Sequence, residues 1–252
     1  MKMCTATTLC ITTLAPVRVP ALVPVLVLVL ALAACADTPS GDKLFPLAEG
    51  HRWTYRVATA IDEDGSTHVE TLTLANRGAD KIDGAVSWRR RSESGIDYWL
   101  RSDHTGIYRI ASKGPLDAVP VLDASRRYVL RLPLAVGTAW QAPTTTYVLE
   151  RKNELPHALR HVIKPVPMNY RVAALDERVD TPAGRFEHCV RVEGVAEIRL
   201  YVDALFQWRQ IPVQAREWYC PGVGLARLER KEPSPTKFMV GGTVTMELVA
   251  WQ

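Results

Sequence analysis

The sequence predicts an all-β protein whose antiparallel strands form a strongly curved sheet (an open or half barrel) or a β-sandwich, with about 10–12 strands. Three observations predict this. Segments that alternate apolar and polar residues recur along most of the chain, and clusters of turn residues separate them at short intervals. No window of a dozen residues shows convincing helical periodicity, and the best helical candidate, residues 155–163, is bounded by Pro165.

An export signal precedes the predicted fold. Lys2 and Arg18 supply positive charge, and residues 21–34 form an apolar run of signal-peptide length, shorter than the ~20 residues of a membrane span. The run ends in Leu32–Ala34 followed by Cys35, which resembles the lipobox of bacterial lipoproteins. The resemblance implies cleavage before Cys35 and a diacylglycerol on its thiol. The alternative is an ordinary signal peptide with an incidental cysteine.

The lipobox sets the expected organisation of the chain. We expect a lipoprotein signal peptide over residues 1–34, a lipidated cysteine and flexible tether over 35–43, and a single all-β domain over 44–252. Several acyl chains, unlike one, anchor a protein stably to a membrane. Ala36 replaces the aspartate typical of inner-membrane retention in enteric bacteria. By this resemblance, the expected location is the outer membrane, facing the periplasm.

The charge of the mature chain gives no indication of a nucleic-acid partner. Without Lys2 and Arg18, the 31 Lys and Arg fall to 29, against 27 Asp and Glu, which leaves a net charge near +2. The densest basic spots are residues 88–91 and 126–127. In an exported protein we interpret them as solvated strand faces.

Two cysteines are left for pairing in the folded domain. Cys4 and Cys10 belong to the signal and Cys35 takes the lipid, so Cys189 and Cys220 remain in an oxidising compartment. We favour a disulfide between them over two free buried thiols.

Strand parity supports the pairing. In residues 189–202 the even positions are apolar, and in 207–220 the odd positions are the more apolar set. An antiparallel hairpin with the two cysteines opposite each other puts both sets on one face and leaves residues 203–206 as the connection. Pro212 must then lie on an edge or at a bulge.

The remaining strands are predicted from the same alternation. Asp62–Gly65 is a hairpin turn that only faintly resembles a calcium loop, and turn clusters also lie at 103–106 and 181–184. The other predicted strands are residues 53–60, 67–74, 85–92, 96–102, 106–112, 126–132, 144–151, 168–175, 224–230 and 243–251.

The motif Pro-Leu-Ala-x-Gly-x-x-Trp occurs twice, at residues 46–53 and 133–140. Proline fixes the approach, glycine allows a turn, and tryptophan begins a strand. The residues that follow the two copies share little, so we interpret the motif as a strand-initiating turn used twice. An ancient duplication is the next interpretation, and a repeated ligand site the last.

These motifs carry a family resemblance. FPLxxGxxWxY after a lipobox, TPAGxFxxC at residues 181–189 and WYxPGVGLxRxE at 218–229 resemble a group of bacterial envelope lipoproteins labelled TapB-like. The group is similar in outline to Lol-type lipoprotein carriers, whose curved sheet encloses an apolar cavity. The resemblance implies no catalytic residues, and glycine-rich 221–224 is expected to be a tight turn.

No motif of nucleophilic, nucleotide-binding or zinc-protease chemistry occurs in the sequence. Glu154, His157 and His161 could share one helical face and hold zinc, but the segment is short and flanked by prolines, so we expect no metal or cofactor there. Strand-end charges at 176–177 and 187–188 suggest no catalytic pair.

We therefore predict a non-enzymatic envelope lipoprotein that binds an apolar or lipid-like ligand in its curved sheet. The alternative is a structural or interaction subunit of an envelope assembly, acting through exposed aromatic side chains and edge strands. For Trp208 and Trp218 we expect packing in the core or under a loop, and an exposed patch for a partner is the alternative.

Overall fold

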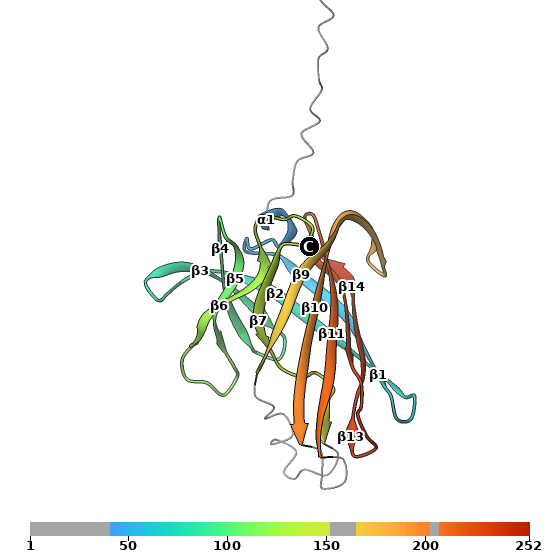
Figure 1. The fold of residues 1–252 in the computed structure, drawn as a ribbon. Helices are drawn as coiled ribbons and strands as arrows, with labels where there is room; N and C mark the ends of the chain where they lie inside the picture. Colours follow the sequence, from blue (N-terminus) through green and yellow to red (C-terminus); the bar gives the residue numbers. More distant parts are fainter. Residues whose placement is uncertain (1–40, 152–164, 202–206) are drawn as a thin grey trace, which may run out of the picture. The chain divides into compact units, whose positions relative to one another are not determined.

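A computed structural model describes residues 41–151, 165–201 and 207–252, all within one compact unit, Thr38–Gln252 (Figure 1). The described part holds one helical turn, α1 (Gly41–Leu44), and fourteen strands. The strands are β1 (Arg52–Ile61), β2 (Thr67–Ile82), β3 (Ala85–Ser92), β4 (Asp97–Asp103), β5 (Gly106–Lys113), β6 (Val121–Arg131), β7 (Ala139–Thr144), β8 (Glu150–Arg151), β9 (Val166–Thr181), β10 (Gly184–Tyr201), β11 (Trp208–Cys220), β12 (Gly224–Glu232), β13 (Met239–Val240) and β14 (Gly242–Trp251).

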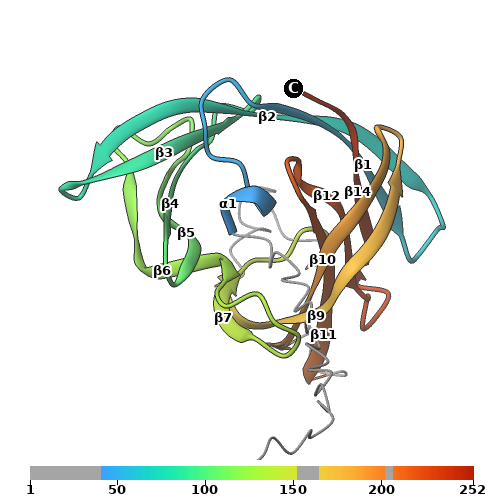
Figure 2. The same ribbon diagram turned by 90° about the horizontal axis from the view of Figure 1, so that it is seen from above.

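Twelve of these strands form one antiparallel sheet in the order β6-β5-β4-β3-β2-β1-β14-β12-β11-β10-β9-β7, while β8 and β13 pair separately. The sheet curls until it is nearly closed and barrel-shaped (Figure 2). Its edge strands β6 and β7 are consecutive in sequence, and no ladder joins them among the described residues. We call the gap between them the seam. The predicted all-β, antiparallel, strongly curved sheet is confirmed, and among the described residues no helix has the length and apolar character of a membrane span.

Most predicted strands are present, and one is wrong. β3 has the predicted bounds, and β2 and β9 run further than their alternation suggests. Residues 144–151 do not form one strand: β7 ends at Thr144, and the chain rejoins a strand only at β8. The physical reason is a long-range contact, because residues 147–149 give their peptide N–H groups to a buried carboxylate instead of to a neighbouring strand.

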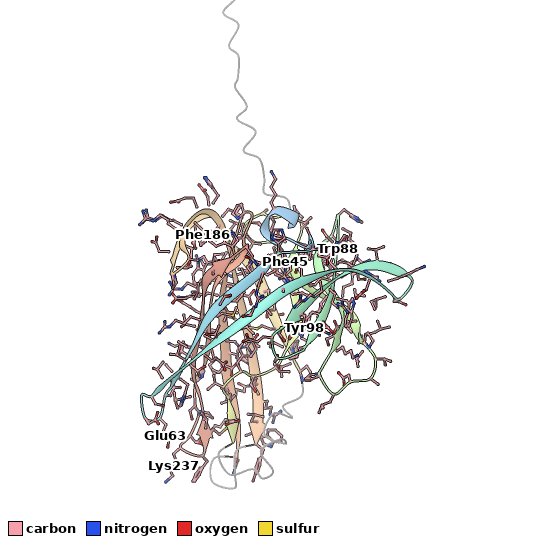
Figure 3. The ribbon with its side chains drawn as sticks, turned by 180° about the vertical axis from the view of Figure 1, so that it is seen from behind. Phe45, Glu63, Trp88, Tyr98, Phe186 and Lys237 are labelled. Carbon is pink, nitrogen blue, oxygen red and sulfur yellow. A yellow bond between two sulfur atoms is a disulfide. The ribbon has the colours of Figure 1, made fainter. Side chains whose placement is uncertain are left out.

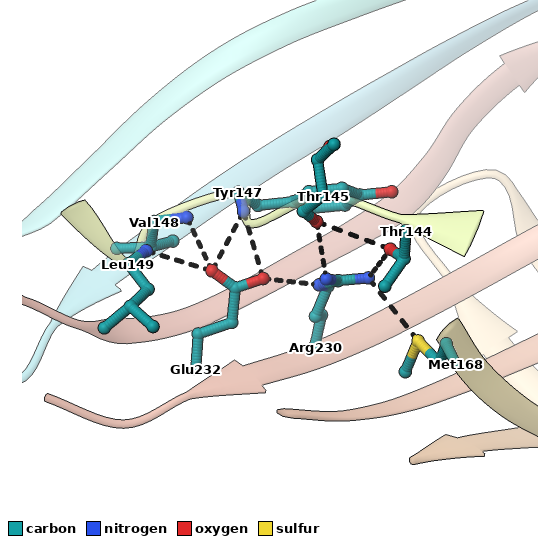
Figure 4. A network of polar contacts seen from close by, with 8 residues as sticks. All are labelled: Thr144, Thr145, Tyr147, Val148, Leu149, Met168, Arg230 and Glu232. Carbon is teal, nitrogen blue, oxygen red and sulfur yellow. Dashed lines mark hydrogen bonds and ion pairs between the residues drawn. The ribbon is translucent and has the colours of Figure 1, made fainter. Parts of the chain in front are cut away.

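That carboxylate is Glu232 at the end of β12, which is fully buried (Figure 4). It accepts hydrogen bonds from the backbone N–H groups of residues 147–149 at 2.8–3.0 Å. Arg230 donates to it at 2.6 Å, and also to Thr144 Oγ1 and the Thr145 carbonyl at 2.9 and 2.7 Å. A buried ion pair is tolerated when hydrogen bonds satisfy both charges. This pair therefore holds the segment after β7 against β12.

The β10–β11 hairpin has the predicted register. Val190 pairs with Tyr219 and Ile198 with Ile211, and both apolar sets are buried on one face. A disulfide joins Cys189 to Cys220. The β11–β12 ladder begins only at Gln214, so Pro212 lies outside it. The N–H group that proline lacks is therefore not needed for pairing with β12.

The disulfide lies on the opposite face of the hairpin and is still buried. The β9–β10 hairpin bends at a series of bulges, with left-handed backbone at Asp176 and His188, and curls over at one end of the barrel (Figure 1). Phe186 on this hairpin packs edge-on against Trp251 of β14, 5.2 Å between ring centres. It packs against a second core, which contains both cysteines and extends to Trp53, Tyr55 and Leu248.

The two tryptophans of the β10–β11 hairpin have different environments. Trp218 belongs to the second core, and its indole N–H donates to Glu177 Oε2 at 2.8 Å. Trp208 is 57% exposed, with the Arg199 guanidinium over its ring. The predicted packing is therefore confirmed for Trp218 and wrong for Trp208, which is exposed.

Both copies of the repeated motif start a strand, with Trp53 second in β1 and Trp140 second in β7. Gly50 and Gly137 have positive φ values of 94° and 92°, as the turns require. The first copy is tied to the predicted PGVG turn between β11 and β12: the Trp53 indole donates to the Val223 carbonyl at 2.6 Å. Both the strand-initiating turns and the tight turn are confirmed.

The prediction that the basic residues 88–91 form a solvated strand face is wrong for Arg90. Arg90 on β3 is buried and donates to Asn76 Oδ1 at 2.9 Å and to the Pro46 carbonyl at 2.8 Å. Its guanidinium lies over the rings of Phe45 and Trp53, at 4.1 and 4.3 Å. Alternation turns this arginine inward while its neighbours face outward. Burial lowers the pKa of Arg90 to about 10, although nearby tyrosines oppose the shift.

The β4–β5 turn contains a charged network at Asp103. Its carboxylate accepts from Thr105 N at 2.7 Å, Tyr108 Oη at 3.0 Å and Arg126 Nη1 at 2.9 Å. Desolvation opposes the ionised form, but these hydrogen bonds and the arginine charge outweigh it and lower the pKa of Asp103 to about 2.

Candidate functional site

One end of the barrel interior is closed by α1. Leu44 is fully buried against side chains of the inner face, and Phe45 packs against Tyr219 with ring centres 6.3 Å apart. The Lys43 carbonyl accepts the N–H of Gly222 in the PGVG turn at 2.7 Å. Figure 2 shows α1 within the ring of strands. Because α1 begins at Gly41, it lies partly within the predicted tether.

Beyond this plug the interior is not filled. A cavity of about 450 Å³ is lined by residues from strands all around the ring, so it lies inside the curved sheet. Figure 3 places Phe45 just below α1 and Tyr98 lower in the same view. The lining residues are Phe45, Tyr55, Leu74, Arg90, Tyr98, Leu100, Arg109, Arg127, Tyr128, Val129, Ala142, Thr145, Tyr147, Tyr170, Glu217, Tyr219 and Leu225. Such a volume is typical of small-molecule sites.

Six of the eight tyrosines of the chain line this cavity, and their hydroxyls fall into two groups. In the first group the hydroxyl is already bonded within the protein. Tyr55 donates to the Leu225 carbonyl at 2.9 Å, Tyr219 donates to Glu217 at 2.6 Å, and Tyr128 bonds to Thr105 at 2.9 Å.

In the second group, Tyr98, Tyr147 and Tyr170, the hydroxyl has no hydrogen-bond partner within the described ranges. Their rings are nevertheless held. Tyr170 stacks on Trp140 at 5.7 Å, and the Arg230 guanidinium lies 4.1 Å from the centre of the Tyr147 ring. These hydroxyls are therefore positioned donors that remain available to a ligand.

The arginines of the cavity differ in the same way. Arg109 makes a forked pair with Asp123 at 2.8 and 2.5 Å, which neutralises its charge. Arg90 is held by neutral oxygens. Arg127 on β6 is half-buried and forms no ion pair or hydrogen bond with any described residue. Burial and the Arg109 charge lower the pKa of Arg127, while Tyr147, Tyr170 and Asp123 act in the opposite direction.

The carboxyl group in the cavity does not neutralise Arg127. Glu217 on β11 accepts the Tyr219 hydroxyl and forms no ion pair with a described residue. Burial raises the pKa of Glu217, although the Tyr219 hydrogen bond and the charges of Arg230 and Arg127 oppose the shift. The cavity wall is thus aromatic and cationic, unlike the apolar cavity that the carrier resemblance implies.

The residues singled out from the sequence have different outcomes. Cys35 and the possible zinc ligands Glu154, His157 and His161 lie outside the described residues. The described part contains no group of His, Cys, Asp and Glu side chains suited to a metal. Asp62–Gly65 forms the expected hairpin turn, and two strand-end charges meet as a hydrogen-bonded, largely exposed pair, Asp176 and His188.

The cavity residues were missed from the sequence alone. Their common signal is a tyrosine or arginine at positions where strand alternation points inward, as at Tyr55, Tyr170 and Tyr219. That signal is weak strand by strand, because an inward tyrosine is usual in a packed core as well.

Comparison with known proteins gives a fold likeness only. No family model and no curated protein match the chain, so the TapB-like resemblance stays a prediction. A candidate lipoprotein from Parabacteroides distasonis has 15% identity and a TM-score of 0.42, over 83% of this chain and 98% of that one. A candidate exported protein with a YmcC-like fold from Bacteroides fragilis has 16% identity and a TM-score of 0.35, over 82% and 98%. We draw no functional argument from likenesses at these TM-scores.

Proposed function

We propose that this protein is a lipid-anchored protein of the bacterial envelope that binds a small amphipathic molecule inside its barrel-shaped sheet, without catalysing a reaction. The anchor rests on the sequence: the apolar run 21–34, the small residues at its end and Cys35 follow one another in the order that lipoprotein processing needs. The outer membrane is the proposed location, from the residue after Cys35.

One observation carries the binding proposal. The interior holds a cavity of about 450 Å³ although α1 already plugs one end of the same interior. A pocket whose wall combines aromatic rings, aliphatic side chains and available polar groups fits a ligand with an apolar body and a polar head.

Co-purification tests the binding. The full chain is isolated from membranes, and organic extracts are analysed by mass spectrometry. We expect one class of amphipathic compound, enriched over extracts of an unrelated lipoprotein. Val129→Trp, which places a large side chain in the cavity wall, should reduce that compound, whereas Val121→Trp on the exposed part of the same strand should not. An extract identical to that of the unrelated lipoprotein would refute binding.

The anchor is tested separately. Cys35→Ser should abolish incorporation of labelled fatty acid and release the protein from the membrane fraction, because Cys35 is the only cysteine next to the apolar run and Cys189 and Cys220 are joined in a disulfide. Retained labelling in this variant would show that the lipobox interpretation is wrong.

A second candidate function, docking to an envelope partner, has one observation in its favour. The hairpin between β5 and β6 carries exposed aliphatic side chains next to the free edge of β6: Leu116 at 99%, Val119 at 68%, and Val121 and Leu122 at 57% and 54%. In Figure 1 this hairpin projects away from the rest of the sheet. Exposed apolar groups beside an unpaired edge favour addition of an extended segment.

Site-specific crosslinking in cells tests the docking. A photoreactive residue at Val121 should give one dominant adduct that disappears when Leu116→Asp and Val119→Asp are introduced together. A set of weak adducts that does not respond to these substitutions would exclude this function.

A further inference from the structure

Three of the four unused polar groups of the cavity lie on the two sides of the seam, and the fourth, Tyr98, is on β4. Arg127 comes from the edge strand β6, and Tyr147 follows directly after the other edge strand, β7. Tyr170 is on β9, where it pairs with Trp140 of β7. These three groups therefore face the cavity from the part of the sheet where the ring does not close.

All three groups are hydrogen-bond donors. The guanidinium of Arg127 offers up to five N–H groups and carries a fixed charge, and each tyrosine offers a hydroxyl. None of the three has a hydrogen-bond acceptor among the described residues. The other two cavity arginines differ, because Asp123 neutralises Arg109 and carbonyl and amide oxygens satisfy Arg90.

A half-buried cation without a counter-ion is unfavourable unless something else supplies the charge. Glu217, the carboxylate of the cavity wall, hydrogen-bonds to Tyr219 and forms no ion pair with Arg127, so no described residue supplies a directly paired counter-ion. An oxyanion such as a carboxylate accepts several hydrogen bonds at once and forms a forked pair with arginine. The missing partner has the chemistry of an anionic head group.

We propose that the cavity ligand is an acid whose anionic oxygen atoms bind Arg127, with the Tyr147 and Tyr170 hydroxyls as further donors and the apolar body directed toward the aromatic and aliphatic wall. This rests on the proposed binding function and narrows it to one class of ligand. A fatty acid, an aromatic acid and a phosphate or sulfate monoester of an apolar alcohol share this chemistry.

A matched pair of probes tests the proposal. They are 11-(dansylamino)undecanoate and its primary amide, which differ in head-group charge and share the fluorescent apolar body. Binding is followed by dansyl fluorescence with the full chain in lipid nanodiscs, and empty nanodiscs provide the blank. We expect the acid to bind the native protein at least about tenfold more tightly than the amide, the scale of a charge-assisted hydrogen bond.

Arg127→Gln should remove that preference by weakening acid binding about tenfold and leaving amide binding unchanged. Arg127→Lys keeps the charge and should retain part of the preference. Arg131→Gln is the matched control, because Arg131 is an exposed arginine on the same strand that does not line the cavity. This control should bind both probes as the native protein does.

The outcomes separate this inference from the binding function on which it rests. Equal binding of acid and amide by the native protein, or a preference that survives in Arg127→Gln, overturns the anionic head group and leaves ligand binding in place. Absence of binding by both probes to the native protein overturns both. The native comparison decides even if Arg127→Gln does not fold.

Discussion

The two copies of the repeated motif place a tryptophan in the same position with opposite hydrogen-bonding states, which predicts unequal effects of the same substitution. Trp53 is 2% exposed, and its indole N–H donates to the Val223 carbonyl at 2.6 Å. Trp140 is 6% exposed, and its indole N–H is buried without a partner among the described residues. Each begins a strand after the same turn.

The magnitude follows from what each Trp→Phe change removes. Both remove the same atoms from a buried site, so much of the packing loss cancels in the comparison. Trp53→Phe leaves the Val223 carbonyl oxygen without its donor, which costs about 1–3 kcal/mol when the group is buried. It also weakens the stacking of Arg90 on the ring. Trp140→Phe removes an unpaired N–H and with it a desolvation penalty of about 1–3 kcal/mol.

We therefore expect Trp53→Phe to lower the free energy of unfolding by at least about 2 kcal/mol more than Trp140→Phe does. Urea denaturation checks this, because a shift in midpoint at an unchanged slope reports stability alone. Losses that agree within about 0.5 kcal/mol would refute the reasoning, since mutational effects of that size are background. The native hydrogen bond of Trp53 would then contribute nothing measurable.

Three further predictions follow from buried or charged groups. Glu232→Ala leaves the charge of Arg230 buried without its carboxylate and should lower the free energy of unfolding by about 3–5 kcal/mol in urea, while a loss below about 1 kcal/mol would contradict a buried ion pair. Replacing Cys189 and Cys220 together by Ala removes a crosslink across 31 residues and should cost about 3–4 kcal/mol in the same assay; no loss would mean that the ladders alone hold the hairpin. Asp103→Asn keeps the acceptor and removes the charge. Because the pKa of Asp103 is lower in the folded than in the unfolded state, its charge stabilises the fold fully above pH 4, and this stabilisation disappears as the pH falls to about 2. After allowance for solvent screening, the variant should be about 1 kcal/mol less stable than the native protein at pH 7 and equally stable near pH 2. A stability difference that persists at pH 2 would exclude a charge effect.

The strands could be predicted because alternation is a local property of the chain. The β10–β11 register is the clearest case: pairing the two remaining cysteines selects it, and strand parity agrees with it. The same argument fails for residues 144–151, where β-branched and aromatic residues indicate a strand. Their peptide N–H groups instead bond to Glu232, more than eighty residues away in sequence. No local pattern reports an acceptor at that distance.

The motifs that carry the family resemblance were predicted to be turns, and the structure adds that two of them form one unit. The first repeated motif and the PGVG turn are joined by the hydrogen bond from Trp53 to Val223, and α1 bonds to Gly222 in the same turn. Arg90 completes the unit from β3, by binding the Pro46 carbonyl. The sequence could not distinguish buried Arg90 from its exposed neighbours in the basic run 88–91. Alternation along β3 shows which side chains share a face, but it does not show that a distant turn lies against that face.

The polar groups inside the barrel differ by location in whether they have partners among the described residues. This difference favours a binding site over an imperfectly packed core. Near the plug and beneath the segment after β7, two buried arginines are satisfied: Arg90 by oxygens of Asn76 and Pro46, and Arg230 by Glu232. A sequence selected only for stability would satisfy Arg127 in the same way, because an unpaired half-buried cation weakens the fold. Violations of local consistency are expected at functional sites, where stability is exchanged for recognition. Three of the four unpaired donors of the cavity lie beside the seam, and the fourth, Tyr98, is on β4. Three donors close together are what a ligand with an anionic head group would require.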